Sequence, residues 1–210
     1  MRILVTAGPT REAIDPVRYL SNRSSGKMGF AIAVAAAGRG HDVTLITGPV
    51  SLPSPAGVKT VRIGTAEEML VAVRGHVPGC EVLIMAAAVA DWRPKTFAAQ
   101  KQKKDVTSAT LELERTPDVL QSVLPLKGER LFIGFAAETE HVVEYAQRKL
   151  VAKGLEAVVA NDVSRGDAGF EVDDNQVTLV TPDAAPEAWP LMSKREVAER
   201  LVRWVEQRAC

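Results

Sequence analysis

The sequence predicts an α/β protein built on a doubly wound, mostly parallel, Rossmann-like sheet. Short apolar runs typical of buried strands alternate with helical segments up to residue 90, and the alternation resumes after residue 115. Residues 92–115 interrupt it and predict a small β-ribbon. The 210 residues suffice for one domain, so we expect a single Rossmann-like domain over 1–210, with a flap at about 92–115 and a β-hairpin region at about 165–181.

The individual elements follow from hydrophobic periodicity and from capping signals. Thr65 and Ser193 are each followed three residues later by a glutamate, which is the pattern of a capping box at a helix start. We expect helices after these two caps and at 26–39, 118–124 and 140–153, the last with Val143, Ala146 and Leu150 turned inward. The expected strands of the main sheet span 3–5, 43–47, 58–63, 81–85, 131–135, 157–160 and 176–180.

The flap is expected to contain two further strands, at 100–106 and 110–114, after Arg93 and Pro94 end the regular structure before it. The second strand would place Leu111 and Leu113 on one face. Because a two-stranded ribbon is only marginally stable alone, we expect it to pack against a second copy of the chain. The sequence therefore predicts a homodimer whose interface includes the flap.

Charge and composition argue against several classes of protein. The 26 Lys and Arg residues balance 26 Asp and Glu residues, which is unlike a bulk nucleic-acid binder or a binder of acidic membranes. No apolar run is long enough to span a bilayer, and the first residues predict a strand rather than a signal peptide, so we expect a cytoplasmic protein. Cys80 and Cys210 make no disulfide framework and are expected to stay reduced.

A long loop joins the first predicted strand to Gly26, at the start of the first helix. Loops of this length in compact domains are usually functional. It ends in SSGKMG, where the unpaired N–H groups of a helix start would favour an anion. Asn22, Ser24 and Ser25 could instead simply cap the helix and turn the chain. A Walker A loop is excluded, because Met28 stands where a magnesium-binding Ser or Thr belongs.

A second group of candidate residues follows the strand at 81–85. The carboxyl ends of parallel strands form the ligand-binding edge of such sheets, so Ala86, Ala87 and Ala88 are expected beside the long loop. Their small side chains would let a flat ring lie against the backbone, or would equally well allow close helix–strand packing. Asp91 could accept a hydrogen bond from a nucleotide or a lysine, coordinate magnesium through water, or serve as an ordinary turn residue.

Short segments distributed along the chain form a larger pattern. The sequence contains, in this order, TAGPTRE, DPVRY, SNRSSGKMG, AAAVADWRP, KQKK, TPD, GFAAET and AND. In sequence and spacing these segments resemble phosphopantothenate–cysteine ligase, a coenzyme A pathway enzyme, in its bacterial CTP-dependent form. The resemblance covers essentially the whole chain.

The resemblance implies an enzyme, an acid–amino-acid ligase that joins 4′-phosphopantothenate to L-cysteine through an acyl-cytidylate and releases CMP and pyrophosphate. It implies CTP as co-substrate and Mg²⁺ held by the CTP phosphates, with no metal ligand from the protein and no flavin in this chain. It also implies a homodimer, and fusion to or association with a flavin-dependent phosphopantothenoylcysteine decarboxylase.

The resemblance further implies roles for individual residues. It assigns catalysis to Asn22 and Lys101, and substrate binding to Asn22, Arg18 and Ala87. Without it, the lysines of the site would count as solvated surface charges. It assigns the nucleotide to Gly8, Ser24, Ser25, Gly26, Ala86, Ala87, Asp91, Lys101, Thr116, Pro117, Asp118, Phe135, Lys149 and Lys153.

Two other functions stay open on the residues alone. An NAD(P)-binding Rossmann oxidoreductase or epimerase would share the fold, although the G-x-G-x-x-G fingerprint is absent and residues 44–48 offer no acidic residue for a ribose. A nucleotide-sensing binding module would need the nucleotide site but no reactive lysine on a flap.

Overall fold

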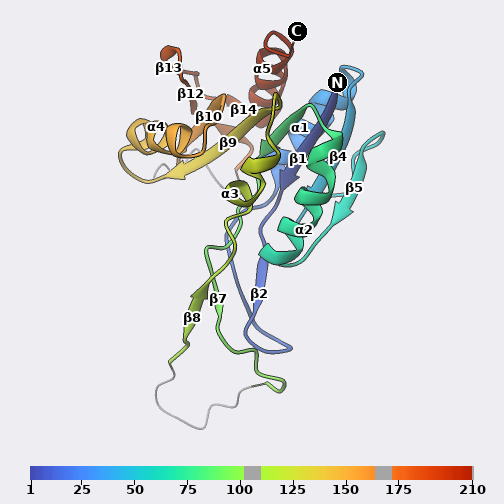
Figure 1. Cartoon of the computed structure of the whole chain (residues 1–210), viewed down its shortest axis with the longest axis vertical. Coiled ribbons are helices and arrows are strands. Elements are labelled where there is room, and N and C mark those ends of the chain that lie inside the picture. The colour runs from blue at the N-terminus through green and yellow to red at the C-terminus, as the bar shows by residue number, and fades with distance from the viewer. Residues whose placement is uncertain (102–109, 164–171, 210) are drawn as a thin grey trace.

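The computed structural model describes residues 1–101, 110–163 and 172–209. Its centre is an 8-stranded sheet with the strand order β13-β12-β10-β9-β6-β1-β4-β5 (Figure 1). The strands of this sheet are β1 (Arg2–Ala7), β4 (Asp42–Thr47), β5 (Lys59–Arg62), β6 (Val82–Met85), β9 (Leu131–Glu138), β10 (Ala157–Asp162), β12 (Val177–Thr181) and β13 (Ala184–Ala188). The helices are α1 (Lys27–Gly38), α2 (Ala66–His76), α3 (Val119–Val123), α4 (Val142–Ala152) and α5 (Lys194–Glu206), with 3-10 turns at Val77–Gly79 and Leu124–Leu126.

The predicted doubly wound, mostly parallel sheet is confirmed. Strands β5, β4, β1, β6, β9 and β10 are parallel neighbours in that order. This is the Rossmann strand order, in which the chain reverses direction across the sheet between β1 and β6. The loops that follow β1 and β6 therefore open into one crevice at the carboxyl edge of the sheet.

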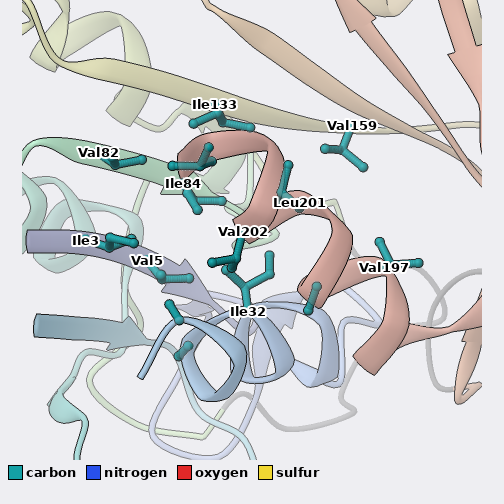
Figure 2. Close-up of a cluster of buried hydrophobic side chains, with 14 of the residues drawn as sticks. Ile3, Val5, Ile32, Val82, Ile84, Ile133, Val159, Val197, Leu201 and Val202 are labelled. Carbon is teal, nitrogen blue, oxygen red and sulfur yellow. The ribbon is translucent and has the colours of Figure 1, made fainter. Parts of the chain in front are cut away.

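Helices cover both faces of the sheet. Helices α1 and α5 pack with one face, and Figure 2 shows Leu201 and Val202 of α5 among sheet residues such as Ile84 and Ile133. Helices α2, α3 and α4 contribute to a second core on the other face. The central strand β6 is apolar over its whole length because both of its faces are buried. No helix in the described part of the chain is long and apolar enough to cross a membrane.

Gly29 brings α1 directly against β1. A Cβ at this position would lie 2.5 Å from Ala7 Cβ and 2.8 Å from Thr6 O. We expect Gly29→Ala to lower the free energy of unfolding by about 1–3 kcal/mol because the helix must move away from the strand. Gly38 in the same helix has nothing within 4 Å of its Cβ position, so Gly38→Ala should raise it by up to about 1 kcal/mol. Urea unfolding of both variants measures the difference, and equal effects would contradict the close approach.

The long loop after β1 contains a hairpin that the sequence did not predict. Strand β2 (Arg11–Ala13) pairs in an antiparallel manner with β3 (Tyr19–Ser21). Asp15 holds the turn between them, because its carboxylate accepts hydrogen bonds from the backbone N–H groups of Val17 and Arg18, each at 2.9 Å. Such local bonds of Asp to the following backbone are typical of turns.

The predicted flap is a ribbon, but its strands differ from the expectation. Strand β7 (Trp92–Pro94) pairs in an antiparallel manner with β8 (Leu113–Arg115). The expected end of regular structure at Arg93 and Pro94 is therefore wrong, since a proline is tolerated in an edge strand that lacks a partner for its N–H. Of the strand expected at 100–106, Gln100 and Lys101 are not in a strand, and the other residues lie outside the described part of the chain. The strand expected at 110–114 begins only at Leu113.

The ribbon and the β2–β3 hairpin extend together away from the main sheet (Figure 1). The backbone N–H of Ala98 donates to Ile14 O at 3.0 Å, which joins the two. We call these residues, 11–21 and 92–115, the arm; residues 102–109 of it are not described.

The β-hairpin near the C-terminus also lies elsewhere than expected. Strands β12 and β13 form it at 177–188, where it extends the main sheet with β12 antiparallel to β10. The expected region at 165–181 overlaps it only in β12, and residues 164–171 are not described. The expected region also contains β11 (Asp174–Asn175), which pairs with β14 (Met192–Ser193) outside the main sheet.

The capping boxes at Thr65 and Ser193 are confirmed. Ala146 and Leu150 of α4 are buried as predicted, but the prediction for Val143 is wrong because its side chain is 36% exposed. Cys80 is buried, and burial raises the pKa of its thiol to about 11.

Candidate functional site

The crevice between β1 and β6 is held together by backbone hydrogen bonds. The N–H of Ala88 donates to Gly8 O at 2.9 Å, and the N–H of Thr10 donates to Ala88 O at 3.3 Å. Thr10 Oγ1 accepts from the N–H of Ala90 at 3.0 Å. These bonds fix the loop after β6 beside the long loop, as the order of the strands predicts.

The start of α1 opens into this crevice without a side-chain cap. Gly26 is the N-cap residue in the left-handed conformation, at φ 79°, and no side-chain cap hydrogen bond is found there among the described residues. The interpretation of Asn22, Ser24 and Ser25 as helix caps is therefore wrong. Ser24 Oγ instead accepts a hydrogen bond from the N–H of Gly26 at 3.3 Å, ahead of the helix. Residues at the N-terminal end of α1 line a cavity, and the helix dipole favours an anion there.

Two adjoining cavities lie along the carboxyl edge of the sheet. The loop cavity has a volume of about 390 Å³, and it is lined by Asn22, Ser24–Gly29, Ala86–Val89, Asp91, Phe135–Glu138, Lys149, Asn161, Asn175 and Lys194. The lysine cavity has a volume of about 490 Å³, and it is lined by Met85, Ala87, Val89–Trp92, Arg115–Leu120, Gly134, Phe135, Lys149 and Lys153. Ala87, Val89, Asp91, Phe135 and Lys149 belong to both walls. A ligand can therefore extend from one cavity into the other.

Asn22 lies at the entrance of the loop cavity. Its amide Nδ2 donates to Ala88 O at 2.9 Å, and the side chain is exposed. The amide is thus oriented by the loop after β6 while its second N–H remains available. This arrangement offers a neutral hydrogen-bond donor next to the start of α1, which suits an oxygen that becomes negatively charged.

Lys149 of α4 and Lys153, the residue that follows its last turn, form one side of the lysine cavity. Lys149 Nζ donates to Phe135 O at 2.7 Å, and Lys153 Nζ donates to Asp118 Oδ2 at 2.6 Å. Asp118 also caps α3 by accepting from the N–H of Gln121 at 2.9 Å. Burial opposes the ionisation of Asp118, but the bonds from Lys153 and Gln121 outweigh it and lower its pKa. Lys149 and Lys153, four residues apart, thus line the same cavity.

Burial lowers the pKa of Lys149 from 10.5. Because the unfolded chain then holds more protons than the folded protein just below pH 10.5, stability should rise with pH in that window. We expect Lys149→Met to raise the free energy of unfolding at pH 7, with a gain that shrinks as the pH approaches 10.5. Urea unfolding at both pH values measures this. Lys153→Met, which removes an ion pair with Asp118, serves as the control, and a pH-independent gain for Lys149→Met would contradict the lowered pKa.

Comparisons with known proteins identify the family of this chain. A sequence profile of the DNA/pantothenate metabolism flavoprotein C-terminal domain matches residues 1–209. The chain belongs to this family. The coenzyme A biosynthesis bifunctional protein CoaBC of Vibrio cholerae is 47% identical over 209 residues, which are 98% of this chain and 52% of that protein. The chain therefore spans about half the length of the curated relatives that it matches.

Two solved structures have the same fold. The crystal structure of the C-terminal domain of CoaBC matches with a TM-score of 0.84 at 43% identity, covering 99% of this chain and 94% of that one. A Cab2 variant in complex with phosphopantothenate-cysteine matches with a TM-score of 0.81, covering 99% and 86%. Its identity of 17% supports likeness of fold alone. The family resemblance read from the sequence is confirmed.

The structure places many of the predicted site residues of this family member on the two cavities. Those on the walls are Asn22, Ser24, Ser25, Gly26, Ala86, Ala87, Asp91, Thr116, Pro117, Asp118, Phe135, Lys149 and Lys153. Gly8 does not line either cavity; it is buried and has a left-handed conformation, with φ 72°. Its carbonyl oxygen accepts the hydrogen bond from the N–H of Ala88. A Cβ at Gly8 would lie 2.9 Å from Val50, so its contribution to the site is structural.

Arg18 and Lys101 are not brought to the cavities. Arg18 lies in the arm, where its guanidinium pairs with Asp15 at 2.5 Å. Lys101 is exposed, also in the arm, and lines neither cavity. Within one copy of the chain, neither residue joins Asn22 on the walls of these cavities.

Sequence reasoning missed several residues of the loop cavity. Glu138, Asn161, Asn175 and Lys194 lie on its wall. The sequence could have indicated Asn161 as a site residue, because it is a polar residue at the carboxyl end of an apolar parallel strand. Nothing in the sequence indicates Asn175 or Lys194, since it is the pairing of β11 with β14 that brings them to the cavity.

Proposed function

We propose that this chain is a phosphopantothenate–cysteine ligase that uses CTP. The observation that carries the proposal is the pair of adjoining cavities, in which Asn22 and the uncapped start of α1 meet the lysine-lined wall. Such a site has donors and positive charge for two anionic reactants but requires no covalent nucleophile. Membership of the family and the identity to CoaBC proteins support the same activity.

The reaction has two steps. The carboxylate of 4′-phosphopantothenate attacks the α-phosphorus of CTP, the bond to the β-phosphate breaks, and pyrophosphate leaves with the electron pair. The amine of cysteine, after loss of a proton, then attacks the acyl carbon, and CMP leaves as the amide forms. Both steps gather negative charge on oxygen, so positioning and electrostatic stabilisation supply the catalysis.

The residues divide between the two reactants. Lys149, Lys153 and Asp118 are proposed to hold CTP in the lysine cavity, with Ala87 and Phe135 beside the base. Asn22 is proposed to donate its free N–H to the reacting carboxylate and to the oxyanion of the second step. As an uncharged donor it adds no charge that would repel an anion.

Magnesium is proposed to bind through the triphosphate of CTP. The carboxylates of Asp91 and Glu138 lie on the loop cavity, and such oxygens accept the water ligands that Mg²⁺ retains. The ion would supply neutralisation of phosphate charge. No flavin site is proposed for this chain.

The arm supports a homodimer with shared active sites. It leaves large apolar side chains exposed, among them Tyr19, Phe97 and Leu113 at 48%, 54% and 43%. Exposed apolar groups gathered on one extension are typical of an interaction surface. We propose that a second copy covers them and that Lys101 acts in the neighbouring site. Arg18 belongs to the same arm and would approach the substrate in the same way.

The full protein is proposed to combine this activity with a second one. The curated relatives are bifunctional proteins of about twice this length. We propose that a flavin-dependent phosphopantothenoylcysteine decarboxylase acts beside this domain, on the same polypeptide or as a partner.

End-product analysis tests the proposed reaction. Protein incubated with CTP, Mg²⁺, phosphopantothenate and cysteine should yield phosphopantothenoylcysteine, CMP and pyrophosphate in equal amounts. Pyrophosphate release that does not require phosphopantothenate would overturn the proposal. Binding of NADPH in place of CTP would favour the oxidoreductase, and CTP binding without turnover would favour the sensor.

We expect CTP to be preferred to ATP by at least about a hundredfold in kcat/KM. A base that is read by backbone groups near Ala87 and Phe135 leaves those groups unpaired when the wrong base binds. Initial rates with each nucleotide at equal concentration measure the preference. Equal turnover would contradict this reading of the base.

A further inference from the structure

Two asparagines of the loop cavity have side-chain carbonyl oxygens that accept no hydrogen bond from the described residues. Asn161, near the end of β10, is 8% exposed, and Asn175, in β11, is 3% exposed. Neither Oδ1 atom has a hydrogen-bond partner within the described parts of the chain. Native proteins rarely bury an acceptor in this state, because the lost bonds to water are not replaced. Both residues line the loop cavity, so a ligand there can supply the donors.

The missing partners must be O–H or N–H groups, because an amide oxygen only accepts. The donors of CTP are its cytosine amino group and its ribose hydroxyls, which the proposed function places in the lysine cavity, away from the walls that Asn161 and Asn175 line, and its triphosphate offers acceptors alone. Phosphopantothenate offers two neighbouring donors, its secondary hydroxyl and its amide N–H. Cysteine offers an ammonium group, which is the competing source.

The charge of the neighbouring side chain favours the acid over cysteine. Lys194 lines the same cavity, is 7% exposed and donates through Nζ to Val172 O. An ammonium group bound beside it would be repelled at low local dielectric constant, whereas an anion would be attracted. The phosphate of phosphopantothenate lies beyond the hydroxyl, at the end of the molecule opposite the carboxylate. The acid therefore places an anion on the Lys194 side of the two donors.

The length of the acid matches the distance between the strands. Asn22 is bonded to Ala88, just after β6, and Asn161 lies on β10, with β9 between them. Neighbouring strands are about 4.8 Å apart, so β10 is about 10 Å from β6. Six bonds separate the carboxyl carbon from the hydroxyl oxygen, a reach of about 7 Å in an extended chain. A carboxylate held at Asn22 therefore brings the hydroxyl within reach of side chains from β10.

We propose that Asn161 and Asn175 accept hydrogen bonds from the hydroxyl and the amide N–H of phosphopantothenate and thereby select this acid. They are specificity-determining residues that act on binding rather than on the reacting atoms. The proposal rests on the proposed function, because it takes the acid substrate from it.

The test combines two kinds of variant with two analogues of the acid. Calorimetry measures the binding of phosphopantothenate, of its deoxy analogue without the hydroxyl, and of the ester analogue without the amide N–H. Wild-type protein should bind each analogue about tenfold more weakly than the acid, a loss typical of one hydrogen bond. Asn161→Ala and Asn175→Ala should each stop discriminating against one analogue. Asn161→Asp and Asn175→Asp keep an acceptor oxygen and should keep the discrimination.

Steady-state kinetics distinguishes recognition of the acid from a purely structural role of the two asparagines. The KM for phosphopantothenate should rise about tenfold in the alanine variants, while the KM for cysteine stays unchanged. Thr60→Val is the matched control, because Thr60 Oγ1 is likewise buried without a partner among the described residues but lines neither cavity. It should change no KM.

The outcomes separate the inference from the proposed function. A rise in the KM for cysteine alone, or equal binding of all three acids by wild-type protein, would overturn the inference while the ligase activity stands. If wild-type protein binds phosphopantothenate but releases no pyrophosphate with CTP, the proposed function fails and the calorimetric comparison still decides the roles of the two asparagines.

Discussion

Asn22→Asp is expected to lower kcat on the order of a hundredfold without unfolding the protein. The change removes the amide donor and places a carboxylate where two anionic reactants must meet. Its bond to Ala88 O is lost as well, because a carboxylate cannot donate to a carbonyl. Initial rates of pyrophosphate release under saturating substrates measure the effect.

Stability provides the control for this substitution. The side chain of Asn22 is exposed and does not cap α1, so the melting temperature should change little. Asn22→Ala removes the donor without adding charge and should lose less activity than Asn22→Asp. Near wild-type activity of Asn22→Asp would refute the catalytic role, and a large fall in melting temperature would indicate a structural one.

Lys101→Ala is expected to abolish activity, and mixing it with Asn22→Asp is expected to restore part of it. Lys101 lies in the arm and lines neither cavity of its own chain. If it acts across a two-fold axis, one site of each mixed dimer carries both defects and the other carries none. Statistical exchange of equal amounts makes half of the dimers mixed, so about a quarter of wild-type activity should return.

The control for complementation is each variant incubated alone under the same conditions of subunit exchange. If Lys101 acts within its own subunit, every site in the mixture keeps one defect and no activity returns. Sedimentation at the assay concentration checks the oligomeric state, and a monomer would contradict the shared site.

Local sequence determined the parallel core and the start of the site. Runs such as residues 81–85 are apolar throughout, and a strand buried on both faces needs this composition. The capping boxes at Thr65 and Ser193 were equally predictable, because their bonds join residues three apart. The place of Ala87 beside the long loop followed from the geometry of parallel sheets, whereas Phe135 was assigned through the family resemblance.

The tertiary structure decided whatever depends on contacts distant in sequence. Trp92 and Arg115 pair across the ribbon, and no local periodicity reveals a three-residue strand whose partner lies so far along the chain. Asn175 and Lys194 reach the loop cavity only through the pairing of β11 with β14. The absence of a side-chain cap on α1 was likewise not predictable from the local sequence, because Ser24 and Ser25 are good capping residues. Only the left-handed turn at Gly26 directs them away from the helix.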